Sequence, residues 1–234
     1  PPVVFSIWGL ALALQGRLFW TTTLFSLALS NKLNFILHLP SLGVWYLISV
    51  GFLPTLAHFL WAAFLQICLG LPFLSANPTA YISLAYDLGR TLLWEKTRNF
   101  RWLGRAVYNQ PTTPIFLLAL GACIVLSGLV TLATRPSSPR RNLLILLWSN
   151  AVFCWTARGL YTPMMCWFFY TLPIVSQLTQ PSLGLTVVVW GVFEVLWRFL
   201  GSHSLEIWAS YVVFLANALI LLPSRDSIRR LKEE

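Results

Sequence analysis

The residues best suited to chemistry lie in one polar segment, 75–113, of an otherwise apolar chain. Asp87 and Arg90 are three residues apart there. Two further arginines, Arg98 and Arg101, follow within the same segment. Because a guanidinium offers paired N–H donors that match a phosphate, the pattern predicts a phosphate-binding loop in which Asp87 orients one arginine. The structural alternative is a local Asp87–Arg90 ion pair that orders the loop.

Aromatic residues alternate with these charges. Trp94, Phe100 and Trp102 occur within nine positions of one another. Such rings form either a belt at the membrane interface or a platform on which a sugar stacks. The belt is the commoner of the two.

Two other charged sites interrupt the apolar runs further along the chain. Arg158 lies at a predicted helix end, where it either extends to the interface or pairs with a bound ligand. Glu194 lies inside an apolar run with Arg198 four residues later. That spacing suits an ion pair within one helix, so a structural role is favoured for Glu194 over a catalytic one.

The sequence predicts no protein-built metal site and no bound cofactor. His38, His58 and His203 occur singly in different segments, without the clustered spacing that zinc sites show. Nucleotide-binding glycine motifs and the G-x-S-x-G motif are absent from the sequence. The net charge of +9 does not indicate nucleic-acid binding, because the basic residues lie in short loops and a tail.

Composition predicts an all-α polytopic membrane protein. The chain is 57% hydrophobic and 10% charged, whereas a soluble domain carries about 25% charged residues. Windows of about 20 apolar residues, the length of a spanning helix, recur along it. The apolar runs cover 3–14, 18–30, 33–50, 52–74, 114–134, 142–158, 163–180, 183–200 and 204–222.

The runs define four regions. We expect transmembrane helices over 1–74, a polar loop over 75–113, transmembrane helices over 114–222 and a tail over 223–234. Basic residues near 135–141 and in the tail favour the cytosol for both, which places the loop on the lumenal side. Residues 18–50 are ambiguous, because polar residues and Pro40 interrupt them; two short helices, a broken helix or a re-entrant pair fit equally.

Short motifs in the same order over about residues 18–200 resemble a known family. The segment from Leu71 to Arg90 resembles the "LPFL…NP..Y…FDLGR" pattern of the dolichyl-phosphate-mannose-dependent α-1,3-mannosyltransferases of the endoplasmic reticulum. Residues 96–103 resemble the "WTVNWRFL" that follows. Further similarities occur at 24–34, 149–173 and 194–197.

The resemblance implies a type C glycosyltransferase with about eight spanning helices and a lumenal active site. It implies inverting transfer of mannose from dolichyl-phosphate-mannose to the five-mannose dolichyl-pyrophosphate oligosaccharide used for N-glycosylation. Arg90, Arg101 and Arg158 are then expected to contact the donor phosphate, with Asp87 and Asn99 in support. The catalytic base is unknown; we expect it in a lumenal loop upstream of Pro1, since the chain does not begin with Met.

The chain also departs from the family pattern. Lys96 and Phe100 replace two tryptophans, and Tyr161, Pro163 and Tyr170 replace expected polar residues. These changes leave open a divergent enzyme, an altered acceptor preference or a non-catalytic paralogue acting as a scaffold. A transporter of lipid-linked sugars is a further alternative, although no internal symmetry is apparent.

Overall fold

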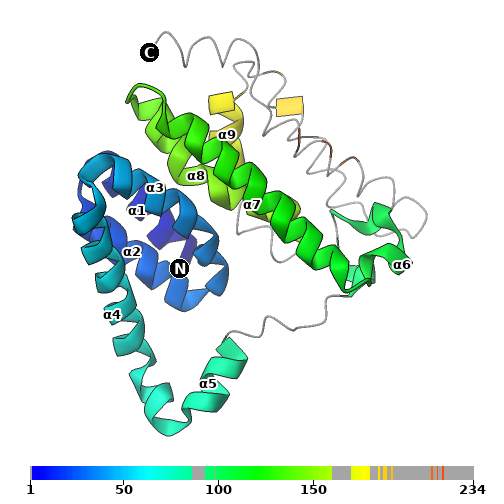
Figure 1. Ribbon diagram of the computed structural model, residues 1–234, viewed down its shortest axis with the longest axis horizontal. Coiled ribbons are helices and arrows are strands. Elements are labelled where there is room, and N and C mark those ends of the chain that lie inside the picture. Colours follow the sequence, from blue (N-terminus) through cyan, green and yellow to red (C-terminus); the bar gives the residue numbers. More distant parts are fainter. Residues whose placement is uncertain are drawn as a thin grey trace. The chain divides into compact units, whose positions relative to one another are not determined.

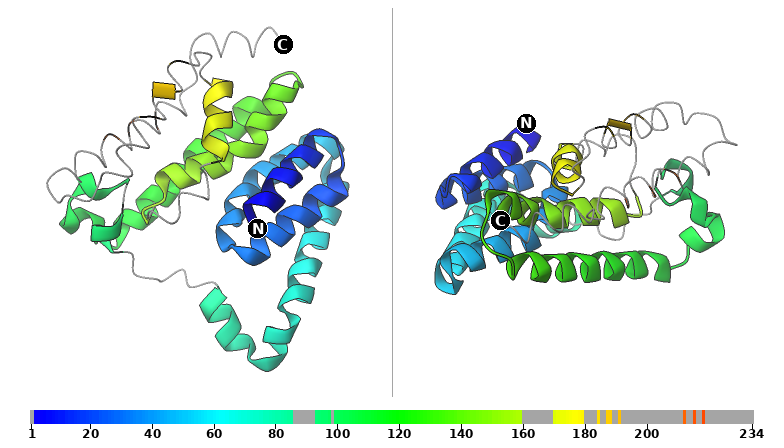
Figure 2. Two further views of the ribbon diagram at one scale, coloured as in Figure 1. Left: turned by 180° about the vertical axis from the view of Figure 1, so that it is seen from behind. Right: turned by 90° about the horizontal axis from the view of Figure 1, so that it is seen from above.

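The computed structural model describes residues 2–85, 93–97, 99–159 and 170–179, with a few isolated positions after residue 180. Contacts divide the chain into two compact units, Pro1–Thr91 and Leu92–Glu234. Within the described ranges every regular element is an α- or 3₁₀-helix (Figures 1 and 2). The all-α class predicted from composition is therefore confirmed.

Unit 1 is a set of helices packed around α2. The elements are α1 (Pro2–Leu14), α2 (Leu18–Asn31), the 3₁₀-helix η1 (Leu33–His38), α3 (Leu39–Val50), α4 (Phe52–Ala76) and α5 (Pro78–Ala85). Helix α1 packs along α2, and both α2 and α3 pack on α4. Figure 1 shows α4 extending well beyond its neighbours before α5 turns back.

The ambiguous stretch 18–50 forms α2 and then a continuous helical run, η1 followed by α3, over Leu33–Val50. Lys32 is extended, with φ −151° and ψ 119°, and it ends α2 before η1 begins. Pro40 lies in the first turn of α3, where its missing N–H costs little. Helices α2 and α3 have 14 and 12 residues, or about 21 and 18 Å at 1.5 Å per residue.

Two turns set the direction of α4 and α5. Gly51 joins α3 to α4 with φ +81°, a left-handed conformation that favours glycine. At the other end of α4, the Asn77 side chain accepts a hydrogen bond from the Ala80 N–H at 3.0 Å and so caps α5. The Tyr81 ring then stacks on Phe73 of α4 at 5.5 Å. The "LPFL…NP..Y" motif thus builds the α4–α5 corner.

Unit 2 begins with a folded loop and continues with a helix pair. Its elements are the 3₁₀-helices η2 (Trp94–Lys96) and η3 (Arg101–Leu103), then α6 (Arg105–Tyr108), α7 (Thr112–Ala133), α8 (Pro139–Thr156) and α9 (Thr171–Thr179). Figure 2 shows α7 and α8 lying side by side. Gly128 makes the close approach possible, because a methyl group there would lie 2.1 Å from Nε1 of Trp148.

Two adjacent arginines close the turn between α7 and α8. Nε of Arg141 donates to the Leu132 carbonyl in the last turn of α7 at 2.9 Å. A guanidinium nitrogen of Arg140 donates to the Leu178 carbonyl near the end of α9. Helix C-termini present unsatisfied carbonyls and partial negative charge, so the two arginines stabilise both ends. In the sequence, these arginines indicated only which side of the membrane the turn faces.

Three helical stretches of the described residues are long and apolar enough to cross a membrane. They are Leu33–Val50, Phe52–Ala76 and Thr112–Ala133. All three match predicted apolar runs within two residues, and the first coincides with the run 33–50. Large apolar side chains stay exposed along them, such as Leu53 at 74% and Ile115 at 68%. Exposed hydrocarbon of this kind suits lipid contact, and the chain has the helices of a membrane protein.

Candidate functional site

The polar loop 75–113 continues into unit 2, and this later part of it has a small hydrophobic core of its own. Phe100, Tyr108 and Leu117 are buried together, and Trp94, Trp102 and Leu103 pack against them. The Trp102 indole donates to the Asn99 carbonyl at 2.9 Å, and the Trp94 indole donates to the Arg101 carbonyl at 3.2 Å. The three aromatic residues singled out in the sequence therefore hold the loop together, with Phe100 only 2% exposed.

This loop is fastened to the C-terminal end of α8 by side chains that cap its carbonyls. The Asn99 amide donates to the carbonyls of Trp155 at 3.1 Å and Ala157 at 2.8 Å. The Thr97 hydroxyl donates to the Arg158 carbonyl at 2.7 Å. Helix ends leave their last carbonyls without intrahelical partners, and these bonds supply them. Thr97 and Asn99 are both fully buried.

Arg158 is positioned by a reciprocal pair of bonds with Tyr108. The Tyr108 hydroxyl donates to the Arg158 carbonyl, and Nη1 of Arg158 donates to the Tyr108 carbonyl, both at 3.2 Å. The guanidinium carbon lies 5.0 Å from the centre of the Tyr108 ring, a cation–π arrangement. The side chain is thus held against the loop in one orientation.

On one edge of the Arg158 guanidinium, a nitrogen makes no hydrogen bond to the described part of the chain. Nε of Arg158 is buried and has no hydrogen-bond partner among the described residues. Nη1 is occupied by the Tyr108 carbonyl, so Nε lies on the other edge of the guanidinium, the Nε–Nη2 edge. Carboxylates and phosphates match that edge. Arg158 is thus a positioned cation whose Nε has no partner among the described residues.

Arg101 lies in the same loop but has different surroundings. It is 5% exposed, donates to the Glu95 carbonyl and stands 5.2 Å from the centre of the Trp94 ring. Arg105 instead lies on the surface, where it pairs with the Glu95 carboxylate at 3.5 Å. These two contacts of Arg101 lie within the loop itself, and the Arg105 pair is exposed and contributes little.

The structure brings Asn99, Arg101 and Arg158 into one loop-and-helix assembly. Asp87, Arg90 and Arg98 lie outside the described residues, as do Glu194, Arg198 and the tail 223–234. Sequence reasoning named Asn99 as supporting but missed Tyr108, which lies fifty positions before its partner Arg158.

Comparison with known proteins identifies the family to which the chain is similar. Residues 2–140 match the profile of the family described as "ALG3 protein". A mouse protein named Dol-P-Man:Man(5)GlcNAc(2)-PP-Dol alpha-1,3-mannosyltransferase is 31% identical over 87% of this chain and 51% of its own length. The human protein of that name is 31% identical over 90% of this chain and 53% of its own length.

A more distant relative matches over a similar range. A Dictyostelium discoideum protein named as a probable enzyme of the same kind is 26% identical over 94% of this chain and 54% of its own length. The chain thus spans about half the length of the curated relatives it matches. No solved structure matches it. With more than half of its residues covered by the family profile, the chain belongs to the ALG3 protein family.

Proposed function

We propose that this protein transfers mannose from dolichyl-phosphate-mannose to the five-mannose dolichyl-pyrophosphate oligosaccharide in α-1,3 linkage. The observation that carries the proposal is the family match over residues 2–140, joined to relatives whose names state this reaction. Apolar helices long enough to span a bilayer fit substrates that are themselves lipids. The product is an intermediate for protein N-glycosylation.

The proposed setting is the membrane of the endoplasmic reticulum, which the chain crosses several times. We assign it to the type C glycosyltransferases, with about eight spanning helices. The segment 75–113 then faces the lumen, while 135–141 and the tail 223–234 face the cytosol. Support comes from the distribution of basic residues, with Arg135, Arg140 and Arg141 close together at one turn.

The chemistry requires a cation at the leaving group. The acceptor hydroxyl oxygen forms a bond to the anomeric carbon, the bond from that carbon to the phosphate oxygen breaks, and dolichyl phosphate leaves with the electron pair. Attack from the opposite face inverts the anomeric carbon, and a carboxylate accepts the hydroxyl proton. Donors fixed in advance at the departing phosphate stabilise its developing charge. No base is assigned within this chain.

Arg158 is the described residue whose geometry best fits the leaving group. Its Nε–Nη2 edge has no described partner, while Tyr108 fixes the other side of the guanidinium. Arg101 and Arg90 are proposed as further phosphate contacts. Asp87 is proposed to orient Arg90, and Asn99 supports the site by holding the loop to α8.

A replacement experiment tests the proposed reaction in its own membrane. Cells that lack the endogenous α-1,3-mannosyltransferase would express the protein from its complete coding sequence, and their lipid-linked oligosaccharides would be sized. We expect the five-mannose species to disappear and longer ones to form. Persistence of the five-mannose species at normal expression and membrane insertion would favour a non-catalytic paralogue or a transporter.

A further inference from the structure

Tyr108 contacts both the backbone and the side chain of Arg158 within unit 2. The Tyr108 hydroxyl donates to the Arg158 carbonyl, and the Tyr108 carbonyl accepts from Nη1. The Tyr108 ring lies 5.0 Å from the guanidinium carbon. A long side chain that is free to rotate loses conformational freedom when a ligand fixes it, and this loss weakens binding. Tyr108 restricts that freedom before any ligand is present.

The same arrangement occurs a second time in the loop. The indole N–H of Trp94 donates to the Arg101 carbonyl at 3.2 Å, and the Arg101 guanidinium carbon lies 5.2 Å from the centre of the Trp94 ring. Each ring therefore binds the backbone of an arginine and carries the guanidinium of that arginine on its face. The two pairs differ because Arg101 donates to the Glu95 carbonyl, whereas Nε of Arg158 has no partner among the described residues.

The ring of Tyr108 matters more to the guanidinium than the hydroxyl does. The Thr97 hydroxyl also donates to the Arg158 carbonyl, at 2.7 Å against 3.2 Å for Tyr108. A carbonyl oxygen has two lone pairs and accepts both bonds. Tyr108 supplies both described contacts of the guanidinium, one from its ring and one from its backbone carbonyl. The carbonyl is present in every side-chain variant, so the ring is the part that a substitution can remove.

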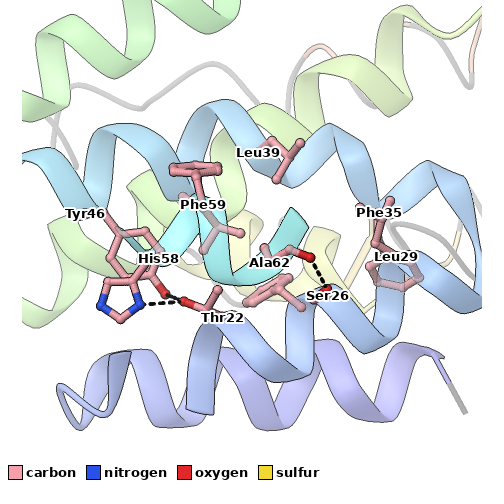
Figure 3. A pocket seen from close by; sticks show the side chains of 11 residues that line it. Thr22, Ser26, Leu29, Phe35, Leu39, Tyr46, His58, Phe59 and Ala62 are labelled. Carbon is pink, nitrogen blue, oxygen red and sulfur yellow. Dashed lines mark hydrogen bonds between the residues drawn. The ribbon is translucent and has the colours of Figure 1, made fainter. Parts of the chain in front are cut away.

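A second buried tyrosine shows the same side chain in a structural setting. Tyr46 lies in unit 1, where its hydroxyl is 2.7 Å from Oγ1 of Thr22 and its ring stacks on His58 with the centres 4.9 Å apart (Figure 3). The Tyr46 hydroxyl also donates to the Leu18 carbonyl at 3.1 Å. None of these partners belongs to the proposed transfer site. Tyr46 is therefore a control for the loss of a buried tyrosine.

We propose that Tyr108 is a positioning residue for the transfer reaction, whose ring orients the Arg158 guanidinium toward the donor phosphate; the inference rests on the proposed function. Tyr108 is fully buried, so it acts through the arginine rather than on the substrate. Attraction between a cation and the face of an aromatic ring is stronger when water is excluded, as it is around this ring.

Binding of a short-chain polyprenyl phosphate to the full-length protein in nanodiscs tests this role without requiring transfer. Tyr108→Phe keeps the ring and should bind nearly as well as the wild type. Tyr108→Leu removes the ring face and should weaken binding by about tenfold, the order of the cost of fixing one long side chain. Tyr46→Leu should lower Tm but leave the affinity unchanged.

A double-mutant cycle separates positioning from a general effect on the loop. If Tyr108 acts through Arg158, adding Tyr108→Leu to Arg158→Ala should cause no further loss of affinity. Damage to the loop core would instead lower the affinity in both backgrounds. The kcat for mannosyl transfer should follow the same pattern.

Ring-fluorinated phenylalanines at position 108 keep the test available if Tyr108→Leu does not fold. Fluorine atoms withdraw electrons from the ring and weaken the negative face that attracts a cation, while the shape of the ring changes little. Affinity for the polyprenyl phosphate should therefore fall stepwise as fluorine atoms are added. A ring that serves only to fill the core would show no such series.

Three results would overturn the inference: equal binding across the fluorinated series, wild-type affinity in Tyr108→Leu, or a loss in Tyr108→Leu that persists beside Arg158→Ala. If the same preparation transfers mannose and Arg158→Ala impairs it, the proposed function stands and only the role of Tyr108 fails. The expected binding pattern in a preparation without transfer would retain Tyr108 as a positioning residue for an anion site and remove the reaction.

Discussion

The two edges of the Arg158 guanidinium have different roles. Tyr108 accepts from Nη1 and supports the planar face, while the Nε–Nη2 edge has no partner among the described residues. A guanidinium held in this way loses little rotational freedom when an anion binds. This residue therefore carries the most specific chemical prediction.

Replacing Arg158 should affect transfer more than folding. Removal of one fixed donor at a developing charge costs about 10²–10³ in rate, so Arg158→Ala should lower kcat/KM by that order. Arg158→Lys should recover only part, because an ammonium cannot form the bidentate contact. Arg105→Ala, which removes an exposed arginine of the same loop, is the control. Equal losses in Arg158→Ala and Arg105→Ala would contradict the assignment.

Replacing Asn99 should lower the stability of the folded protein. Asn99→Ala removes two hydrogen bonds to the end of α8 from a fully buried amide, at a cost of about 1–3 kcal/mol. Asn31→Ala is the control, since the Asn31 amide bonds to the Leu27 carbonyl on an exposed surface. Thermal unfolding in detergent should show a clear fall in Tm for the first variant alone. An unchanged Tm for Asn99→Ala would mean that the loop is not fastened to α8 through this residue.

For single helices, the sequence predicts where each helix begins and ends better than it predicts which residues contact one another. Apolar runs predicted α4 and α7 within two residues of their observed ends. The break after Asn31 was visible as polar residues, yet only the structure shows that η1 fills it. The short helices within 75–113 were not predicted, because caps and an aromatic core rather than a long apolar run define them.

Close packing of α7 on α8 depends on a small residue. Gly128→Ala places a methyl group 2.1 Å from the Trp148 ring nitrogen, so the tryptophan or the helix must move. Overpacking of this kind costs about 1–3 kcal/mol. At Gly43 in α3, the nearest atom to an added methyl lies 3.6 Å away, an ordinary contact. Gly128→Ala should therefore lower Tm in detergent, while Gly43→Ala should leave it unchanged or raise it. The opposite order would show that Gly128 is not a packing site.

For the whole molecule, the sequence predicted class, membrane character and family but not how the proposed site is assembled. Thr97, Asn99 and Tyr108 contact the end of α8 and Arg158 just after it, across 50 to 61 positions of chain. Contacts over such separations depend on tertiary packing and leave no periodic signal. Family motifs identified Asn99 and Arg158 without showing that they belong to one assembly.

Membrane topology supplies a prediction at this scale. An acceptor sequon within a flexible insert after Gln110 should be glycosylated in microsomes, since segment 75–113 is proposed to be lumenal. The same insert after Ser137, beside the basic residues near α8, should remain unmodified. Digestion with an endoglycosidase and gel mobility would distinguish the two. Modification of the second insert alone would reverse the proposed orientation.

Mannosyl transfer by the purified full-length protein in nanodiscs tests the central claim most directly. Radiolabelled dolichyl-phosphate-mannose and the five-mannose lipid acceptor would be the only sugar substrates, and the product would be sized and its linkage determined. The account predicts a six-mannose product with a new α-1,3 linkage, formed about 10²–10³ times more slowly by Arg158→Ala. A folded wild-type protein that forms no such product would contradict it.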